Sequence, residues 1–506
     1  MEIPREIILI IQKLKKAGFP AYIVGGCVRD VLRNKKPKDW DIATLAKPEE
    51  IQMIFSDSFY KNKFGTVTVK TPPCDSTLKE VEITTFRKDE KYSDKRHPDK
   101  ISFAQNIEED LSRRDFTINA MAIQLMPPRS AQDELTTQNK QQMTIIDPIG
   151  GQKDLKNKII KTVGSPEHRF SEDALRLLRA VRFSVTLGPG WQIEKNTFLA
   201  IKKFSTLIKA ISKDRIRDEF IKIVESQRAA EGVLLLHKIK LLEHIIPELE
   251  KGVGMPQNRH HIYTIFQHSI LSLKYAAKYN YNLNVRLAAL LHDIAKPQTK
   301  RGEGAFATFY NHDVLGARIT TRILKRLRFP KKIIEKVALL VRYHMFYYDP
   351  EKVTESSVRR LLQRVGKENI DELIQVRICD RKGSGVPKAY PFRLRHFKYV
   401  LERVKSHPIS VSMLKVNGND VMGTLKIDSG PRVGLILNAL LAEVIEDPQR
   451  NSKNYLIKRI KELASLSDFE LKSKHKIIEE KKMEVDEELK KRVGIRVNKI
   501  PSQKAG

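Results

Sequence analysis

Two aspartates, Asp39 and Asp41, stand one residue apart shortly after a pair of glycines, Gly25 and Gly26. If residues 40–44 form a strand, side-chain alternation points both carboxylates to one face. Carboxylate oxygens are the hard ligands that Mg²⁺ prefers. Two such ions can stabilise the attacking and leaving oxygens of a phosphoryl transfer. The aspartate pair therefore predicts a magnesium site for phosphoryl-transfer chemistry.

The residues before the aspartates predict a turn that binds phosphate. Residues 21–24 are apolar and predict a short buried strand, Gly25 and Gly26 a tight turn, and residues 28–32 the start of a helix. Glycines let backbone N–H groups approach a ligand closely, and a helix N-terminus attracts phosphate. A triphosphate beside two carboxylates indicates a nucleotidyltransferase centre. The alternative, a glycine turn followed by a solvated acidic loop, is less consistent with the close order of these pieces.

Further elements are expected around this centre. Residues 48–55 predict a helix, and the alternating residues 66–69 and 81–84 predict strands of one sheet. Glu82, in the second of these strands, is either a third carboxylate near the metals or a surface residue.

A second polar group follows the expected sheet. Arg114 is suited to neutralise a phosphate, Asp115 to orient it, and Asn119 to reach a ribose hydroxyl. The same residues are also compatible with a helix that begins at Asp115 and is capped by it. Upstream, residues 87–98 are densely charged and end in proline. They predict a loop beside the site that orders substrate or, alternatively, a hairpin tip.

The segment SEDALRLLRAVRF offers a means of choosing a base. Ser171 is a good helix N-cap. Acidic and basic residues then recur at every third position along one helical face: Asp173, Arg176, Arg179 and Arg182. A carboxylate accepts from the exocyclic amino group of cytosine or adenine, while an arginine donates to the neighbouring ring nitrogen. Uracil and guanine present a carbonyl there, so such a pair would select CTP and ATP. Ordinary acid–base pairs on a helix surface are the alternative.

The composition indicates a nucleic-acid partner. Lysine and arginine total 93 against 61 aspartates and glutamates, a formal net charge of +32, and such an excess favours a polyanion. The three cysteines are too few and too scattered for a disulfide framework or a zinc site, which suits a reducing cytoplasm. Residues 7–11 predict an amphipathic helix, and no stretch is long enough to span a bilayer. We expect a cytoplasmic protein without a membrane or a stable protein partner.

Histidines and aspartates recur in the second half in an order typical of metal ligands. His292 and Asp293 are adjacent in an apolar segment, and other helices would bring in His268, His312, His344 and Asp380. Such a set can bind one or two divalent ions and activate a water molecule for attack on a phosphoester. The alternative is a group of core histidines without a ligand.

The order of the motifs resembles the superfamily of class II tRNA nucleotidyltransferases and bacterial poly(A) polymerases. The matching motifs are GGCVRD (25–30), DWD (39–41), RRDFTINAMA (113–122), DPIGGQKDL (147–155), SEDALRLLRAVRF (171–183) and SKDRIRDE (212–219). The resemblance implies a head with a mixed sheet, followed by helical neck and body domains. It also implies that the DWD aspartates bind magnesium and that the residues spaced by three form an amino-acid template for the base. An intact segment resembling RxDxxYxDxRxP argues for an enzyme able to add A, and the SEDALR form resembles CCA-adding members more than poly(A) polymerases.

These observations, together with the resemblance, which implies that Gly26, Arg29 and Arg114 contact the nucleotide, define a set of predicted site residues. The predicted catalytic residues are Asp39, Asp41 and Glu82. The predicted nucleotide-binding residues are Gly25, Gly26, Arg29, Arg114, Asp115, Asn119, Glu172, Asp173, Arg176, Arg179 and Arg182.

The histidine-rich segment resembles the HD metal-dependent phosphohydrolase family. The residues that match its ligands are His268, His292, Asp293 and Asp380, while His312 and His344 match optional positions for a second metal. The resemblance implies a divalent transition metal or Mg²⁺. Some class II tRNA nucleotidyltransferases carry such a domain and have phosphatase or 2′,3′-cyclic phosphodiesterase activity.

We predict an α+β protein whose head carries a mixed sheet and whose remaining domains are helical. The expected domains are a nucleotidyltransferase head (1–150), a helical neck with the template (151–250), an HD domain (251–400), a C-terminal helical RNA-binding module (401–465) and a charged tail (466–506). The predicted function is addition of CCA to the tRNA 3′ end from CTP and ATP, with a possible phosphohydrolase activity. The alternatives are a poly(A) polymerase, an A-adding or CC-adding enzyme, and an HD phosphohydrolase whose head only binds RNA.

Overall fold

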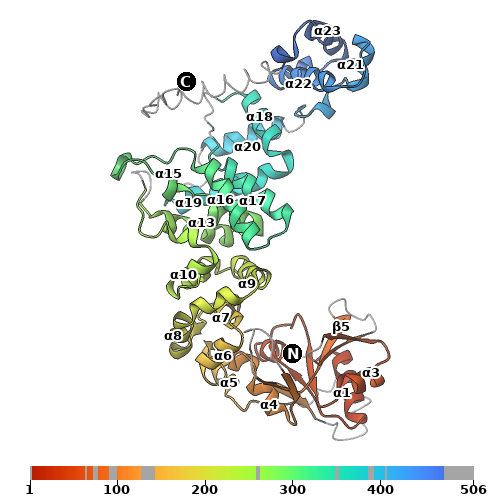
Figure 1. The fold of residues 1–506 in the computed structure, drawn as a ribbon, viewed down its shortest axis with the longest axis vertical. Coiled ribbons are helices and arrows are strands. Elements are labelled where there is room, and N and C mark those ends of the chain that lie inside the picture. The colour runs from red at the N-terminus through yellow and green to blue at the C-terminus, as the bar shows by residue number, and fades with distance from the viewer. Residues whose placement is uncertain are drawn as a thin grey trace, which may run out of the picture. The chain divides into compact units, whose positions relative to one another are not determined.

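A seven-stranded mixed sheet lies in the N-terminal region, and helices make up most of the remainder (Figure 1). The computed structural model describes residues 3–62, 65–71, 78–90, 100–126, 143–257, 262–346, 348, 353–385, 392–404 and 407–471. The predicted α+β fold class is confirmed. The chain divides into two compact units, Met1–Arg342 with Gln375–Pro387 and Tyr343–Ile374 with Lys388–Gly506. The five expected domains stay a prediction.

The sheet contains each strand that the sequence predicts. Its strands are β1 (Ala21–Val24), β2 (Asp41–Thr44), β3 (Ser58–Asn62), β4 (Thr66–Lys70), β5 (Glu80–Thr85), β8 (Ala122–Leu125) and β9 (Met143–Ile146). Their order across the sheet is β3-β4-β5-β2-β1-β8-β9. β2 and β5 run parallel, whereas the other neighbouring pairs run antiparallel.

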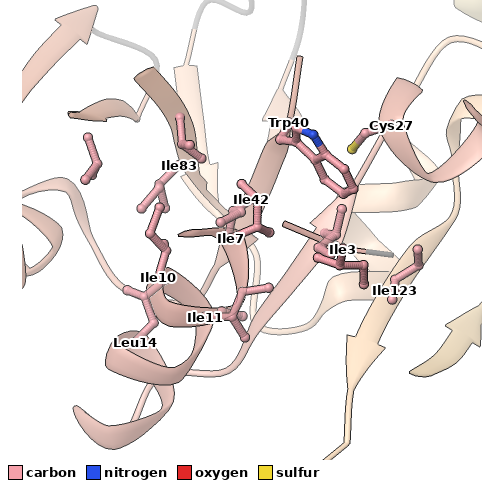
Figure 2. Close-up of a cluster of buried hydrophobic side chains, with 14 of the residues drawn as sticks. Ile3, Ile7, Ile10, Ile11, Leu14, Cys27, Trp40, Ile42, Ile83 and Ile123 are labelled. Atoms are coloured by element: carbon pink, nitrogen blue, oxygen red, sulfur yellow. The ribbon is translucent and has the colours of Figure 1, made fainter. Parts of the chain in front are cut away.

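One face of the sheet packs against α1 (Arg5–Lys16), the helix expected from the apolar residues near the N-terminus. Its buried residues recur at helical spacing: Ile7, Ile10, Ile11 and Leu14. Figure 2 shows them gathered with Ile42, Ile83 and Ile123 of the strands. Burying an isoleucine stabilises the fold by about 1.5–3 kcal/mol, so this face fixes which side chains of β2 and β5 point the other way.

The opposite face packs against α4 (Ile107–Ser112). Because Ile42 and Ile83 point towards α1, alternation leaves Asp41 and Glu82 on the α4 side. Two short helices, α2 (Gly26–Leu32) and α3 (Pro48–Ile54), complete the first part of the head.

The charged segment 87–98 begins as a strand. Its first residues form β6 (Arg87–Glu90), which pairs with β7 (Lys100–Phe103). The prediction of a loop is therefore wrong for residues 87–90, whose backbone pairs in register with that of residues 100–103. Residues 91–99 lie outside the described residues.

A helical region follows the sheet. Its elements are α5 (Gly151–Asn157), β10 (Ile159–Ile160), α6 (Pro166–Glu172), α7 (Leu175–Thr186), β11 (Gln192–Ile193), α8 (Lys195–Lys203), η3 (Ser205–Ala210), α9 (Lys213–Glu225), α10 (Ala229–Lys238), α11 (Leu242–Ile245) and α12 (Pro247–Glu250). A short helix, η2 (Thr117–Asn119), lies earlier, directly before β8. The prediction that Ser171 caps the template helix is wrong. Ser171 lies in the last turn of α6, because Pro166 at a first-turn position starts that helix earlier. Asp173 then stands at the break before α7.

The remaining elements are also helical. They are α13 (Ile265–Lys278), α14 (Leu283–Leu291), α15 (Lys296–Thr299), η4 (Gly304–Phe306), α16 (His312–Arg326), α17 (Lys331–Tyr343), α18 (Glu355–Val365), η5 (Lys367–Asn369), α19 (Ile370–Gly383), α20 (Phe392–Val404), η6 (Val411–Met413), α21 (Gly418–Leu425), α22 (Pro431–Glu446), η7 (Pro448–Arg450) and α23 (Lys453–Leu463). Within the described ranges, every helix is too short or too polar to cross a bilayer.

Candidate active site and metal centre

The glycine turn, Asp41 and Arg114 meet at one point on the α4 side of the sheet. Val24, the last residue of β1, pairs with Asp41, the first residue of β2. Gly25 follows with φ +86°, a conformation that favours glycine. A Cβ atom on Gly25 would lie 2.9 Å from Arg114 Nη1 and 3.3 Å from Asp41 Oδ2. The missing side chain thus leaves a small space between a cation and a carboxylate.

Glu82 lies beside Asp41. The two residues are register partners on the parallel strands β2 and β5, so their side chains share one face. Both are half-buried. Their carboxylates and the adjoining space at Gly25 fit the hard oxygen ligands of a magnesium ion.

Asp39 is placed differently from the sequence expectation. β2 begins at Asp41 rather than at Trp40, so strand alternation does not extend to Asp39, which is exposed. Trp40 between them is buried in the core on the α1 side. That Asp39 shares a magnesium site with Asp41 stays a prediction.

Arg114 is held by a carboxylate that the sequence analysis missed. Asp110, buried on α4, accepts from Arg114 Nη2 at 3.0 Å and from Arg113 Nε at 2.9 Å. Burial disfavours the charged form of Asp110, but Arg114 and Arg113 outweigh burial and lower its pKa. Arg113 and Arg114 follow Asp110 by three and four residues, and this helical spacing could have predicted the ion pairs from the sequence.

A chain of hydrogen bonds links the head to the neck. Arg29 Nη1 donates to Asn119 Oδ1 at 2.7 Å, and Asn119 Nδ2 donates to Asp115 Oδ1 at 3.1 Å. Asp115 Oδ2 accepts from Arg179 Nε of α7 at 2.8 Å. Burial disfavours ionisation of Asp115, yet Arg179 and Asn119 lower its pKa to about 2. Asp115 and Asn119 therefore hold arginines in this structure, and their direct contact with nucleotide stays a prediction.

The ring of Phe183, which the sequence analysis did not single out, brings the arginines of head and neck together. Its centroid lies 5.3 Å from the guanidinium carbon of Arg29, 5.4 Å from that of Arg179 and 4.0 Å from that of Arg182. These distances are typical of cation–π contacts. Arg182 also forms a 2.9 Å ion pair with the buried Glu219 of α9.

The remaining template residues have separate partners. Glu172 Oε2 accepts from Arg169 at 2.9 Å and also pairs with Arg176. Arg176 Nη2 further donates to the backbone carbonyl of Arg113 at 3.2 Å. Asp173 pairs with Arg215 of α9 at 2.9 Å. The structure thus gathers the predicted template beside the head, although Asp173 precedes α7 rather than sharing its face.

Four predicted ligands of the HD segment converge in the protein interior. The Nε2 atoms of His268 and His292 lie 2.9 Å apart. Asp293 Oδ2 is 3.3 Å from each of them, and Asp380 Oδ1 is 3.3 and 3.8 Å away. All four side chains are buried. Nitrogen and carboxylate atoms facing one point at these distances fit a divalent ion.

The hydrogen bonds around the cluster suit metal binding. His292 Nδ1 is 2.9 Å from the Ala289 carbonyl, and His312 Nδ1 is 2.7 Å from the Phe309 carbonyl. A proton on each Nδ1 would leave Nε2 as a lone-pair donor. His312 Nε2 lies 3.5 Å from Asp293 Oδ1.

Close helix packing and a buried lysine, both missed from the sequence, shape the HD cluster. A Cβ atom on Gly383 of α19 would overlap Ser272 of α13, so the two helices approach closely and bring Asp380 to His268. Lys296 Nζ lies 2.7 Å from Asp293 Oδ2. Burial disfavours the charge on Asp293, but His292 and Lys296 hold its pKa well below the usual range. In the sequence HDIAK, Lys296 follows Asp293 by three residues, and this spacing could have predicted their ion pair.

His344 is buried directly after α17 and belongs to the second compact unit. Its part in a second metal site stays a prediction. Among the residues that the structure describes, groups of three potential ligands within 4.8 Å occur only around His292.

Comparison with known proteins identifies the family. Family models match the chain as a poly A polymerase head domain (residues 21–161), a probable RNA and SrmB-binding site of polymerase A (190–252) and an HD domain (265–382). An A-adding tRNA nucleotidyltransferase of Deinococcus radiodurans is 30% identical over 442 residues, covering 83% of this chain and 91% of the relative. The chain belongs to the tRNA nucleotidyltransferase family. The resemblance seen in the motifs is therefore confirmed.

Other members of the tRNA nucleotidyltransferase family match different lengths of the chain. A CCA-adding enzyme of Lactobacillus helveticus is 45% identical over 215 residues, covering 42% of this chain and 48% of the relative, about half its length. The solved CCA-adding enzyme of Bacillus stearothermophilus, in complex with CTP, covers 91% of this chain and 98% of that chain, with a TM-score of 0.65 and 27% identity. This similarity confirms the expected fold over 91% of the chain.

Proposed function

We propose that this tRNA nucleotidyltransferase completes the CCA sequence at the tRNA 3′ end from CTP and ATP. The supporting observation is the meeting of Gly25, Asp41 and Arg114 beside Glu82. Mg²⁺, when bound by Asp39, Asp41 and Glu82, would polarise the RNA 3′-hydroxyl and neutralise the departing pyrophosphate. The backbone at Gly25 admits the triphosphate without a side chain in the way, and Arg114 contributes positive charge to it.

The base is chosen by the neck in this proposal. The carboxylate of Asp173 accepts from the amino group of cytosine or adenine, and Arg176 donates to the ring. Arg29, Arg179 and Arg182, grouped around Phe183, hold the nucleotide between head and neck. The charged segment 87–98, whose residues 91–98 are not described, remains our expectation for the element that supports A addition.

The exposed face of α16 supports RNA binding. Arg318, Arg322 and Lys325 are exposed at helical spacing and, among the described residues, form no ion pair. Arg326 and Arg328 nearby are instead paired with Glu248 and Asp214. Spaced cations of this kind neutralise backbone phosphates.

Binding of tRNA at different salt concentrations tests this face. Replacing Arg318, Arg322 and Lys325 together with glutamine should reduce the slope of log affinity against log salt by about 2, because each phosphate contact releases counterions. The paired arginines, changed to glutamine in a control protein, should leave the slope nearly unchanged. An unaltered slope in the triple variant would refute the contact.

A-only addition is the second candidate, because the relative that covers 83% of the chain is an A-adding enzyme. Both can be tested with magnesium and tRNA transcripts that end before CCA, after C and after CC. CTP and ATP are supplied singly and together, and the 3′ ends are sequenced. Products ending at CCA on all three transcripts support the proposal. ATP use on the CC-ended transcript alone supports A addition, and A-tails of variable length would indicate a poly(A) polymerase.

We further propose that the HD cluster is a phosphohydrolase site. A divalent ion held by His268, His292, Asp293 and Asp380 would activate water for attack on a phosphoester. Opening of 2′,3′-cyclic nucleotides to nucleoside monophosphates, and release of phosphate from such monophosphates, are measured with added Mg²⁺, Mn²⁺ or Ni²⁺ to test this function. Hydrolysis without any nucleotide addition would favour the alternative of a hydrolase whose head only binds RNA.

Because its substrate would be tRNA, we place the protein in the cytoplasm.

A further inference from the structure

The motif SKDRIRDE is part of the family resemblance, but the proposed mechanism gives it no task. It forms the first turns of α9. Its first arginine, Arg215, reaches Asp173 across the neck: Nη2 donates to Asp173 Oδ2 at 2.9 Å and Nη1 to Oδ1 at 3.4 Å. The side chains retain only 27% and 16% of their exposure, so both are largely screened from water. The contact joins residues 42 positions apart in the chain.

The Asp173 carboxylate also accepts a hydrogen bond from a residue close to it in the chain. It stands in extended backbone between α6 and α7, with φ −135° and ψ 103°. Its Oδ1 accepts from the backbone N–H of Leu175, the first residue of α7, at 3.0 Å. A carboxylate offers about four acceptor sites. Among the described residues, these three donors occupy all but about one of them.

We propose that Arg215 is a positioning residue for base selection. Together with the N–H of Leu175, it fixes the plane of the Asp173 carboxylate so that the remaining acceptor site faces the exocyclic amino group of cytosine or adenine. The proposal rests on the proposed role of Asp173 as the base-reading carboxylate. A carboxylate that rotates freely would meet a carbonyl or an amino group with less difference in energy, so fixing it strengthens discrimination.

The chemistry of arginine suits this task better than that of lysine. The planar guanidinium binds a carboxylate through two N–H groups and so determines its orientation, whereas an ammonium group acts as a point charge. Charge alone would hold Asp173 ionised but would leave its plane less defined.

The chain provides a matched control on the same helix. Arg217 has a similar exposure of 21% and pairs with Asp218 at 2.8 Å and Asp214 at 3.6 Å. It also donates to the backbone carbonyl of Arg328. Replacing Arg217 therefore disturbs α9 to a similar extent without removing a contact to Asp173.

The test compares wild-type protein with Arg215→Gln, Arg215→Lys and Arg217→Gln. Equilibrium binding of CTP, UTP, ATP and GTP is measured for each, together with kcat/KM for incorporation into tRNA. We expect Arg215→Gln to lose about tenfold of the preference for CTP over UTP and for ATP over GTP. Arg215→Lys should recover part of it, and Arg217→Gln should keep the wild-type ratio. Because each preference is a ratio measured on one protein sample, it does not depend on the fraction of that variant that is folded. Thermal melting measures the stability of each variant separately.

Three results would overturn the proposal. Arg215→Gln with the wild-type base preference would show that Asp173 does not depend on the contact. Equal loss in Arg215→Gln and Arg217→Gln would indicate a general disturbance of α9. Wild-type protein that binds all four nucleotides equally would contradict the base-reading role of Asp173 itself, and would thereby distinguish failure of the proposed function from failure of this inference.

Discussion

The head site and the HD cluster differ in how closely the protein brings their predicted metal ligands together. In the HD cluster, the Nε2 atoms of two imidazoles lie 2.9 Å apart and 3.3–3.8 Å from the oxygens of two carboxylates, inside a helical core. In the head, the predicted metal-binding carboxylates Asp39, Asp41 and Glu82 are half-buried or exposed, and the neighbouring Arg114 pairs with Asp110. We infer that helix packing preforms the predicted ligand set of the HD cluster, whereas the predicted head site is completed only when substrate and metal bind.

The largest expected effect comes from removing the charge of Asp41. Asp41→Asn should reduce nucleotide incorporation by about a thousandfold. The Asp41 carboxylate borders the space at Gly25, so its charge is the one we expect to bind the magnesium ion beside the triphosphate. HD hydrolysis should be unaffected. Incorporation is measured with radiolabelled nucleotide, and unimpaired incorporation would remove Asp41 from the metal site.

His292→Ala should have the reverse pattern. Loss of a ligand at the centre of the buried cluster should lower hydrolysis of a 2′,3′-cyclic nucleotide by at least about a hundredfold and leave nucleotide addition near wild type. Metal content, measured by elemental analysis of the purified protein, should fall as well. Equal metal content in both proteins would argue that the cluster is a core without a metal.

Gly25→Ala should separate the space at the glycine turn from its conformation. The new Cβ would press on Arg114 and Asp41, so we expect nucleotide incorporation to fall by about ten- to a hundredfold. Gly18 has nearly the same φ, +87° against +86°, but an added Cβ there meets nothing within 4 Å. Gly18→Ala should therefore cost about 1–2 kcal/mol of stability, the penalty for an L-residue at positive φ, while preserving activity. Similar activity in the two variants would contradict the role of the space.

The smallest effect concerns the link between head and neck. The pKa of Asp115 lies at about 2 in the folded protein against 3.8 for an ordinary aspartate. Its ionised form therefore contributes about 2 kcal/mol of stability above pH 4, which is lost as the pH falls towards 2.

Guanidinium unfolding between pH 2 and pH 6 measures this contribution. The protein has two tryptophans, Trp40 in the head and Trp191 in the neck, whose fluorescence reports on the linked regions. Asp115→Asn should be less stable than wild type at pH 6 and should lose less stability on acidification. Parallel pH profiles would show that the ion pair with Arg179 is not the source.

Sequence reasoning succeeded where periodicity and local turn chemistry decide structure. Alternating residues located β4 and β5, and the order of strand, glycine pair and helix located the turn at Gly25. It failed at Ser171, where local capping preference was overruled by the earlier helix start at Pro166. It also extended β2 by one residue and so assigned Asp39 to a face that the strand does not reach.

The sequence by itself determined the family, the kinds of residue at both sites and the elements that carry them, because these depend on motifs and on neighbours within a few positions. Only the tertiary structure decided the pairings of Arg29 with Asn119, Asp115 with Arg179 and Asp173 with Arg215, which are 90, 64 and 42 residues apart. Helical and strand periods place side chains on a face, but they do not say which distant face will be opposite. That choice is made by packing of the core, which brings the charged partners together.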